Sequence, residues 1–196
     1  MRSTEIYKND SYKLLEEKNL LNLPINLDEL ANKLDIEVKY SPLKSDVSGK
    51  INYNSIDDNV IIHINSNEYE LRQRFSLAHE LSHYIYDINF NEDIEIEDND
   101  KTLFRKDVIN PIEKRANKYA EKLLMPKKLF VAEINTIKDN LFPDTDNKIG
   151  IPNIYKLVEE LSSKFKVSKP AVIIRLHSIG KIKDPIKKKL FDYHYA

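Results

Sequence analysis

Two histidines four residues apart, with a glutamate directly after the first, have the types and spacing of a metal site that carries its own general base. These residues are His79, Glu80 and His83. On an α-helix, positions four apart lie one turn from each other on the same face, so both imidazoles can reach one ion. Glu80 is too close to His79 to chelate the same ion comfortably, but it is placed to contact a water molecule on that ion. The spacing therefore predicts half of a zinc site.

The residues around this motif have a continuous helical pattern. No Gly or Pro occurs from Arg72 to Tyr86, and apolar residues recur there at the spacing of one helix face. The β-branched segment Asn59–Asn65 precedes this helix and predicts a strand. A strand leading into an active-site helix suits a peptidase, because an extended substrate can pair with the edge of a sheet. The simpler alternative is an amphipathic helix with two surface histidines.

A catalytic zinc site usually has three protein ligands, and the third must be sought elsewhere in the chain. The chain has no Cys. A metzincin-type site needs Gly and His three and six residues after His83, where the sequence has Tyr86 and Asn89. A second predicted helix begins after Asn110 and carries Glu113 in its first turn, with Asn117 one turn later. Glu113 is either the third ligand or a carboxylate stabilised by the helix dipole, and spacing alone leaves both interpretations open.

Two sequence blocks resemble the ImmA/IrrE family of bacterial and phage metallopeptidases. The first block is residues 72–84, and the second is residues 113–126, which ends in Leu-Leu-Met-Pro. Weaker similarity is found at residues 28–31, 165–168 and 175–176, so the resemblance covers most of the chain. The order and separation of the two main blocks make the resemblance specific.

The resemblance implies roles for the residues of both blocks. It assigns His79, His83 and Glu113 as ligands of Zn²⁺ and Glu80 as the catalytic base of peptide hydrolysis. From its position on the second helix, we expect Asn117 to hydrogen-bond and orient a ligand histidine. Four residues could stabilise the oxyanion of the transition state, and the sequence does not choose among them. A structural role is the simpler interpretation of each. The four residues are His63, Tyr155, Arg175 and His177.

The resemblance also implies a substrate and a biological role. Family members act on a narrow target, a helix-turn-helix transcriptional repressor often encoded nearby, whose cleavage derepresses genes of a mobile element or a stress response. We therefore expect a hydrolase that acts in transcription regulation. The alternative is a non-catalytic regulatory protein that binds DNA or the repressor and has a structural zinc site. Glu80 favours the peptidase, because a structural site has no use for a base at that position.

Composition is typical of a globular cytoplasmic enzyme. The chain has 196 residues, a net charge of −1 and no Cys, so it has ample length for a core and no disulfide framework. Its first residues are polar, and no apolar run approaches the ~20 residues needed to span a bilayer. We expect a cytoplasmic location and no membrane partner.

The fold class expected is α+β. We predict a zincin-like core with a small twisted β-sheet packed on helices at residues 1–137, a linker at 138–152 and a C-terminal helical segment at 153–196 packed on the core. Between the two metal helices, residues 91–100 carry six acidic side chains and are expected to form a solvated loop. The other expected elements of the core are helices at 10–18, from 26 and from 126 to 137, and strands at 36–40, 49–53 and 60–64.

The C-terminal segment resembles a helix-turn-helix. A first helix is expected to carry Ile154 and Phe165 on its buried face, and Ser168 is expected to cap a second helix that Gly180 ends. Residues 153–196 contain ten Lys and Arg against four Asp and Glu, a net charge of +6, which is compatible with DNA binding. The second helix is apolar at its start, however, where a recognition helix needs polar side chains that read bases. Packing or substrate docking is therefore the favoured interpretation.

Overall fold

The computed structural model of the protein describes residues 4–8, 10–88, 92–99, 110–141 and 150–195. The fold is α+β, as predicted, with a four-stranded sheet and helices that include a C-terminal group. It divides into two compact units, Met1–Leu124 and Met125–Ala196. The N-terminal unit carries the sheet and both helices that were predicted to hold a metal.

The sheet has mixed topology and the strand order β1-β3-β2-β4. Strand β1 pairs in parallel with β3, whereas β2 pairs antiparallel with both β3 and β4. The predicted strands β1, β2 and β3 are all present. The strands are β1 (Ile36–Ser41), β2 (Val47–Asn54), β3 (Asn59–Asn65) and β4 (Ile94–Asn99).

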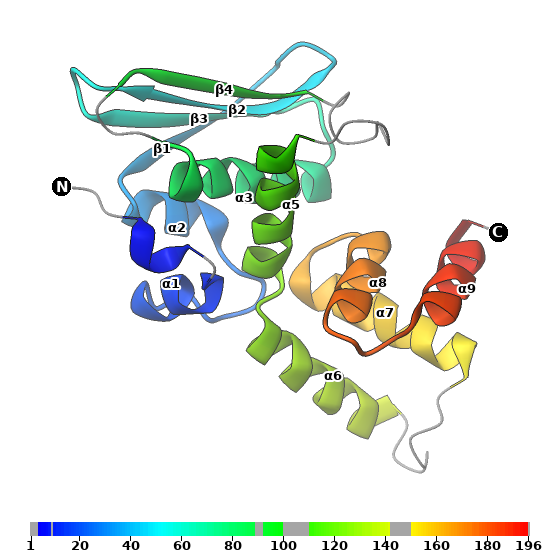
Figure 1. Cartoon of the computed structure of the whole chain (residues 1–196). Coiled ribbons are helices and arrows are strands. Elements are labelled where there is room, and N and C mark those ends of the chain that lie inside the picture. Colours follow the sequence, from blue (N-terminus) through cyan, green and yellow to red (C-terminus); the bar gives the residue numbers. More distant parts are fainter. Residues whose placement is uncertain (1–3, 9, 89–91, 100–109, 142–149, 196) are drawn as a thin grey trace. The chain divides into compact units, whose positions relative to one another are not determined.

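One face of the sheet packs against helix α3 (Glu70–Tyr86), which lies along β2 and β3 (Figure 1). Because side chains alternate along a strand, one alternating set of buried hydrophobic residues of β2 and β3 points to this face. From the sheet they are Ile51, Tyr53, Val60, Ile62 and Ile64, and from α3 they are Leu77, Ala78, Leu81, Tyr84 and Ile85. Burial of each of the larger side chains contributes roughly 1.5–3 kcal/mol, so this layer fixes the orientation of α3 against the sheet.

The prediction of a loop at residues 91–100 is wrong for Ile94–Asn99, which form the edge strand β4. Ile94 and Ile96 alternate along this strand and pair in register with Tyr53 and Ile51 of β2. On the opposite side of the strand, Glu95 accepts a hydrogen bond from Lys50 at 3.2 Å. The central part of this acidic segment is therefore an edge strand of the sheet. Residues 91 and 100 lie outside the described part of the chain.

Helix α5 (Pro111–Leu124) is the second predicted metal helix, and it packs against α3 (Figure 1). Asn110 caps it as predicted, because its Oδ1 accepts a hydrogen bond from the Ile112 amide at 3.0 Å. Its inner face is buried through Ala116, Tyr119, Ala120, Leu123 and Leu124, whereas Ile112 is 41% exposed. Ile112 lies in the first turn, where it faces solvent beside Glu113 instead of packing into the core.

In Figure 1 the N-terminal helices lie below α3 and beside α5, and they contact both helices. They are the short 3₁₀ helix η1 (Glu5–Tyr7), α1 (Ser11–Glu17) and α2 (Leu27–Lys33). The Ser11 hydroxyl donates to the carbonyl oxygen of Lys122 at 3.0 Å, and the Arg74 guanidinium donates to that of Ile25 at 2.6 Å. Both α5 and α3 are thereby tied to this layer.

The C-terminal unit is helical. It contains α6 (Lys127–Leu141), α7 (Ile151–Phe165), α8 (Lys169–Ser178) and α9 (Asp184–Tyr195). Ser168 caps α8 as predicted, accepting a hydrogen bond from the Ala171 amide at 3.3 Å. The predicted linker at 138–152 is partly helical, because α6 continues to Leu141 and α7 begins at Ile151. No helix was predicted after Gly180, where the chain forms α9.

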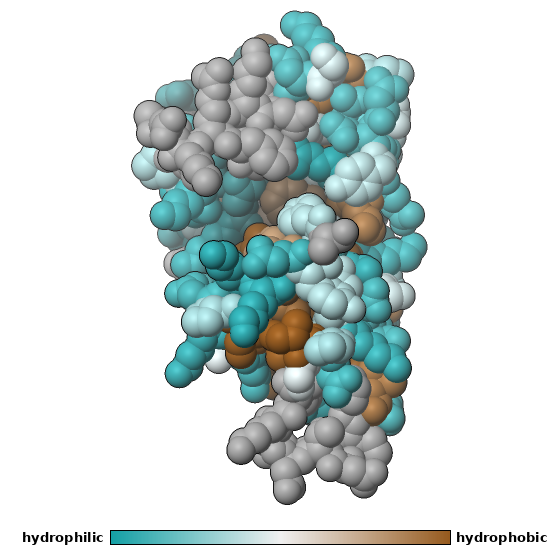
Figure 2. All heavy atoms as spheres, turned by 90° about the vertical axis from the view of Figure 1, so that its right-hand side faces the viewer, coloured by the Kyte–Doolittle hydropathy of each residue, from teal (hydrophilic) through white to brown (hydrophobic). Residues whose placement is uncertain are grey.

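The surface is predominantly hydrophilic on the side shown in Figure 2, where hydrophobic patches are small. The exposed aromatic residues of α9, Tyr193 and Tyr195, are 52% and 74% exposed. Within the described residues, no helix combines the length and hydrophobicity needed to cross a membrane.

Candidate metal centre

Three potential metal ligands meet between α3 and α5. The Nε2 atoms of His79 and His83 lie 3.0 Å apart, and Glu113 Oε2 lies 3.0 Å from His79 Nε2. Glu113 Oε1 lies 3.7 Å from His83 Nε2. A tetrahedral zinc ion with bonds of ~2.0–2.1 Å separates its ligand atoms by roughly 3.3 Å. The structure thus brings together the three residues that were predicted as ligands, at separations that fit one zinc ion.

The hydrogen bonds of the two Nδ1 atoms determine the tautomers of His79 and His83, and with them the nitrogen lone pairs that face the centre. His79 Nδ1 donates to Asn117 Oδ1 at 3.0 Å, and His83 Nδ1 donates to Asp87 Oδ2 at 2.8 Å. With a proton on each Nδ1, both Nε2 atoms of the neutral rings present lone pairs, and these converge with the Glu113 carboxylate. Such a group of acceptors requires a cation, which is either a metal ion or a proton.

In the metal-free protein a proton on His83 can take this position, because its neighbours favour the charged imidazolium. Burial lowers the pKa of His83, but hydrogen bonds with Asp87 and Glu113 and the nearby charge of Glu80 outweigh it and raise the pKa to about 10. Hydrogen bonds with His79 and His83 outweigh burial at Glu113 and lower its pKa to about 2. Protonated His83 therefore stabilises the metal-free fold below pH 6.5, and this stabilisation is lost as the pH rises towards 10. Ionised Glu113 contributes above pH 4.5, and its contribution is lost as the pH falls towards 2.

Zinc binding should consequently release at least one proton per chain at pH 7. His83 is protonated there in the metal-free protein, whereas Glu113 is already ionised, and zinc must displace the proton from its ligand. Titration calorimetry in buffers of different ionisation enthalpy measures this release directly. We also expect zinc affinity to rise with pH below pH 10. Binding without proton release at pH 7 would contradict the assigned charge states.

Glu80 follows His79 on α3 and lies against Gly49 of the sheet. It is fully buried, as are His79 and His83, whereas the Glu113 side chain is 12% exposed. A buried carboxylate is costly unless a positive charge lies nearby, which is a second reason to expect a cation here. A Cβ atom on Gly49 of β2 would lie 2.9 Å from Glu80 Oε1. The glycine therefore leaves the space that the Glu80 carboxylate occupies.

A β-bulge in β2 lies directly before Gly49. The register of β2 with β4 shifts between Val47 and Gly49, which leaves Ser48 as the extra residue. Ser48 is fully buried, and its hydroxyl accepts a hydrogen bond from Arg72 of α3 at 2.9 Å. Bulges of this kind redirect side chains next to functional sites. Here the bulge sets the part of β2 that faces Glu80.

Replacing Gly49 with alanine should displace Glu80 while the ligands stay in place. We expect Gly49→Ala to lower the rate of the peptide hydrolysis predicted from the sequence roughly 100-fold, as a misplacement of about 1 Å can do, and to keep zinc affinity within a few-fold of wild type. Kinetics and zinc titration of the same preparation measure both effects. Gly150→Ala is the matched control, because its new Cβ would meet only Pro152 Cδ at 3.8 Å. Wild-type kinetics in Gly49→Ala would contradict the proposed close packing.

The four residues considered for oxyanion stabilisation have other surroundings. His63 points to the face of the sheet that α3 does not cover, and it pairs in register with Lys39 of β1 and Lys50 of β2. Burial and the charges of these two lysines lower the pKa of His63. In the C-terminal unit, Tyr155 bonds His194 Nδ1 at 2.8 Å and His177 pairs with Asp184 at 2.9 Å. Arg175 is buried and donates from Nε to the carbonyl oxygen of Met125 at 2.9 Å. None of these contacts links the four residues to the metal centre.

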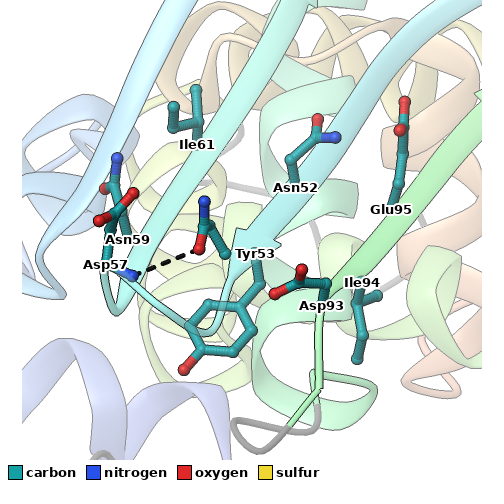
Figure 3. Close-up of a pocket in the computed structure, with 9 residues that line it drawn as sticks. Asn52, Tyr53, Asp57, Asn59, Ile61, Asp93, Ile94 and Glu95 are labelled. Atoms are coloured by element: carbon teal, nitrogen blue, oxygen red, sulfur yellow. Dashed lines mark hydrogen bonds between the residues drawn. The ribbon is translucent and has the colours of Figure 1, made fainter.

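A hollow of about 540 Å³ lies on the outer face of the sheet, away from α3. Figure 3 shows Asn52, Ile61 and Glu95 projecting into it from neighbouring strands. Its other polar groups shape the β2–β3 turn. Asp93 accepts hydrogen bonds from the amide and hydroxyl of Ser55, both at 2.7 Å, and Asn54 Oδ1 accepts one from the Asp57 amide at 3.3 Å. The hollow is separate from the metal centre.

Sequence reasoning missed three residues next to this centre, namely Asp87, Arg115 and Gly49. Asp87 lies four residues after His83, and this helical spacing could have predicted their hydrogen bond. Gly49 is one of only three glycines in the chain and lies inside a strand, where glycine often marks a bulge or a close approach. Arg115 had no comparable signal.

The fold and the centre define a class of protein. Two histidines and a glutamate from paired helices, with a buried glutamate directly after the first histidine, form the arrangement found in zinc peptidases with a His-Glu-x-x-His helix. A sequence model of the Peptidase_M78 family, described as the IrrE N-terminal-like domain, matches residues 31–177. The chain therefore belongs to this family, which confirms the predicted resemblance and implies a metallopeptidase. No curated protein matches the chain in a sequence comparison.

Proposed function

We propose that the protein is a zinc-dependent endopeptidase in which His79, His83 and Glu113 bind the metal and Glu80 is the general base. The observation that carries this proposal is the convergence of the three ligand atoms, all within 4.8 Å of one another, beside a fully buried glutamate on the same helix. Membership in a metallopeptidase family supports it independently. The donor set of two imidazoles and one carboxylate is typical of catalytic zinc.

The chain's own residues supply the proton transfers. Zinc, when bound, acts as a Lewis acid towards the attacking water and the scissile carbonyl group. The Glu80 carboxylate accepts the proton from that water during attack and then donates it to the departing amine nitrogen. Gly49 leaves room for this carboxylate, and Asn117 orients the His79 ring through its Nδ1 hydrogen bond.

A structural zinc site is a poorer explanation of this geometry. A structural site is closed by four protein ligands, whereas the described residues bring together three His or Glu ligands. It would also give no reason to bury the Glu80 carboxylate against a glycine in the adjacent strand. The same features suit a site in which one position is kept for water and substrate.

The substrate we propose is a helix-turn-helix transcriptional repressor, which would make the protein a regulatory protease. The similarity of the two sequence blocks to the ImmA/IrrE family supports this substrate class. The experiment is co-expression of the protein with repressors encoded near its own gene, followed by intact-mass analysis. We expect two fragments whose masses add up to that of the repressor plus one water. An intact repressor in every pairing would contradict this substrate class but leave the metal centre untouched.

A further inference from the structure

Asp87 lies at the end of α3, one turn after His83. Its backbone amide donates to the carbonyl oxygen of His83 at 2.8 Å, so it caps the helix directly at the metal-bearing turn. Its Oδ2 atom accepts the hydrogen bond from His83 Nδ1 at 2.8 Å, and its side chain is only 13% exposed. A carboxylate in this position fixes both the ring orientation and the proton on Nδ1.

Arg115 of α5 holds the other oxygen of this carboxylate. Its guanidinium donates to Asp87 Oδ1 and lies over the ring of Tyr86, 4.9 Å from the ring centre. The Tyr86 ring in turn contacts the ring of Tyr119 of α5 edge to face, with the ring centres 5.3 Å apart. Because Arg115 follows Glu113 by two residues, the ion pair joins the metal-bearing end of α5 to the last turn of α3. The Asp87 carboxylate is thus held from two sides.

The two ligand histidines consequently have different supports. His79 donates to the neutral amide oxygen of Asn117, whereas His83 donates to a carboxylate. A charged acceptor forms the stronger hydrogen bond and increases the basicity of the imidazole that faces the metal. His83 is therefore the ligand with the stronger support.

We propose that Asp87, held by Arg115, is a positioning residue that orients His83 for metal binding; this inference rests on the proposed zinc site. Removing the carboxylate in Asp87→Ala should weaken zinc binding about 10- to 100-fold, the usual effect of losing such a partner. Asp87→Asn retains an oxygen that can accept from Nδ1, so it should recover most of this loss. Arg115→Met leaves the carboxylate in place and should have an effect of only a few-fold.

The experiment measures zinc affinity of the full-length protein by competition with a chromophoric chelator, so its readout is independent of peptidase activity. Asp57→Ala, which changes an exposed Asp of the β2–β3 turn, is the matched control. Long-range ¹H–¹⁵N spectra of the zinc-loaded protein report the His83 ring. We expect a slowly exchanging Nδ1 proton in wild type and rapid exchange in Asp87→Ala.

The outcomes separate this inference from the function on which it rests. If wild type binds zinc and Asp87→Ala binds it equally well, the positioning role is overturned and the zinc site stands. Equal losses in Asp87→Asn and Asp87→Ala, with His83 Nδ1 exchange unchanged, would reduce Asp87 to a structural link between helices and also overturn the proposal. Absence of zinc binding in wild type would overturn both the inference and the proposed function.

Discussion

The Glu80→Gln variant should bind zinc as wild type does and lose peptide hydrolysis. The amide has nearly the same size and shape as the carboxylate, so it fits the space left by Gly49, but it cannot accept a proton from the attacking water. General acid–base catalysis typically contributes about 10²–10⁴-fold to a rate, and we expect a loss in this range. Zinc content and cleavage rate are measured on the same preparation.

A matched control separates this effect from a general loss of charge. Glu16 is exposed on α1, and Glu16→Gln should retain wild-type activity. Glu80→Gln with an unchanged cleavage rate would show that the base is another group, even if the zinc site is correct. Loss of zinc together with activity would instead show that the Glu80 charge is needed for metal binding.

His79→Ala should abolish both zinc binding and hydrolysis. His79 Nε2 lies 3.0 Å from both His83 Nε2 and Glu113 Oε2, so its removal takes away the ligand that adjoins both others. We expect zinc affinity to fall by more than the ~10- to 100-fold typical of losing a residue that only supports a ligand. Zinc is quantified after dialysis against a weak chelator.

His63→Ala is the control for His79→Ala, because His63 lies on the opposite face of the sheet. It should keep one zinc ion per chain and full activity. Retention of zinc by His79→Ala at wild-type affinity would place the metal elsewhere. Melting curves of the zinc-free forms show whether either variant disturbs the fold.

Half of the metal site could be predicted from helix periodicity alone. A spacing of four residues places His79 and His83 on one face of any α-helix, and the apolar residues around them define which face is buried. Glu113 was different, because a first-turn carboxylate has an equally good explanation in the helix dipole. The resemblance of the second sequence block decided in favour of a ligand, and the structure brings Glu113 to the two histidines.

Two elements, β4 and α9, were not predicted from the sequence, and both lie in segments rich in charged residues. In β4, dense acidic residues suggested a solvated loop, although Ile94 and Ile96 already alternated as a strand requires. No helix was predicted after Gly180, although Asp184 and Pro185 of α9 form a typical helix start. Only Leu190 of that helix is buried, so its hydrophobic pattern was weak. Gly49 could not be assigned to Glu80 from sequence, because the contact depends on how a bulged strand lies on a helix.

The most direct test of the proposed peptidase is cleavage of a proteome-derived peptide library by the zinc-loaded protein, with new termini identified by mass spectrometry. A library removes the dependence on one chosen substrate. We predict new termini that disappear when zinc is removed, return when it is restored, and are absent with zinc-loaded Glu80→Gln. Wild-type protein that holds one zinc ion yet produces no termini beyond those of Glu80→Gln, from either the library or the repressors, would contradict the account.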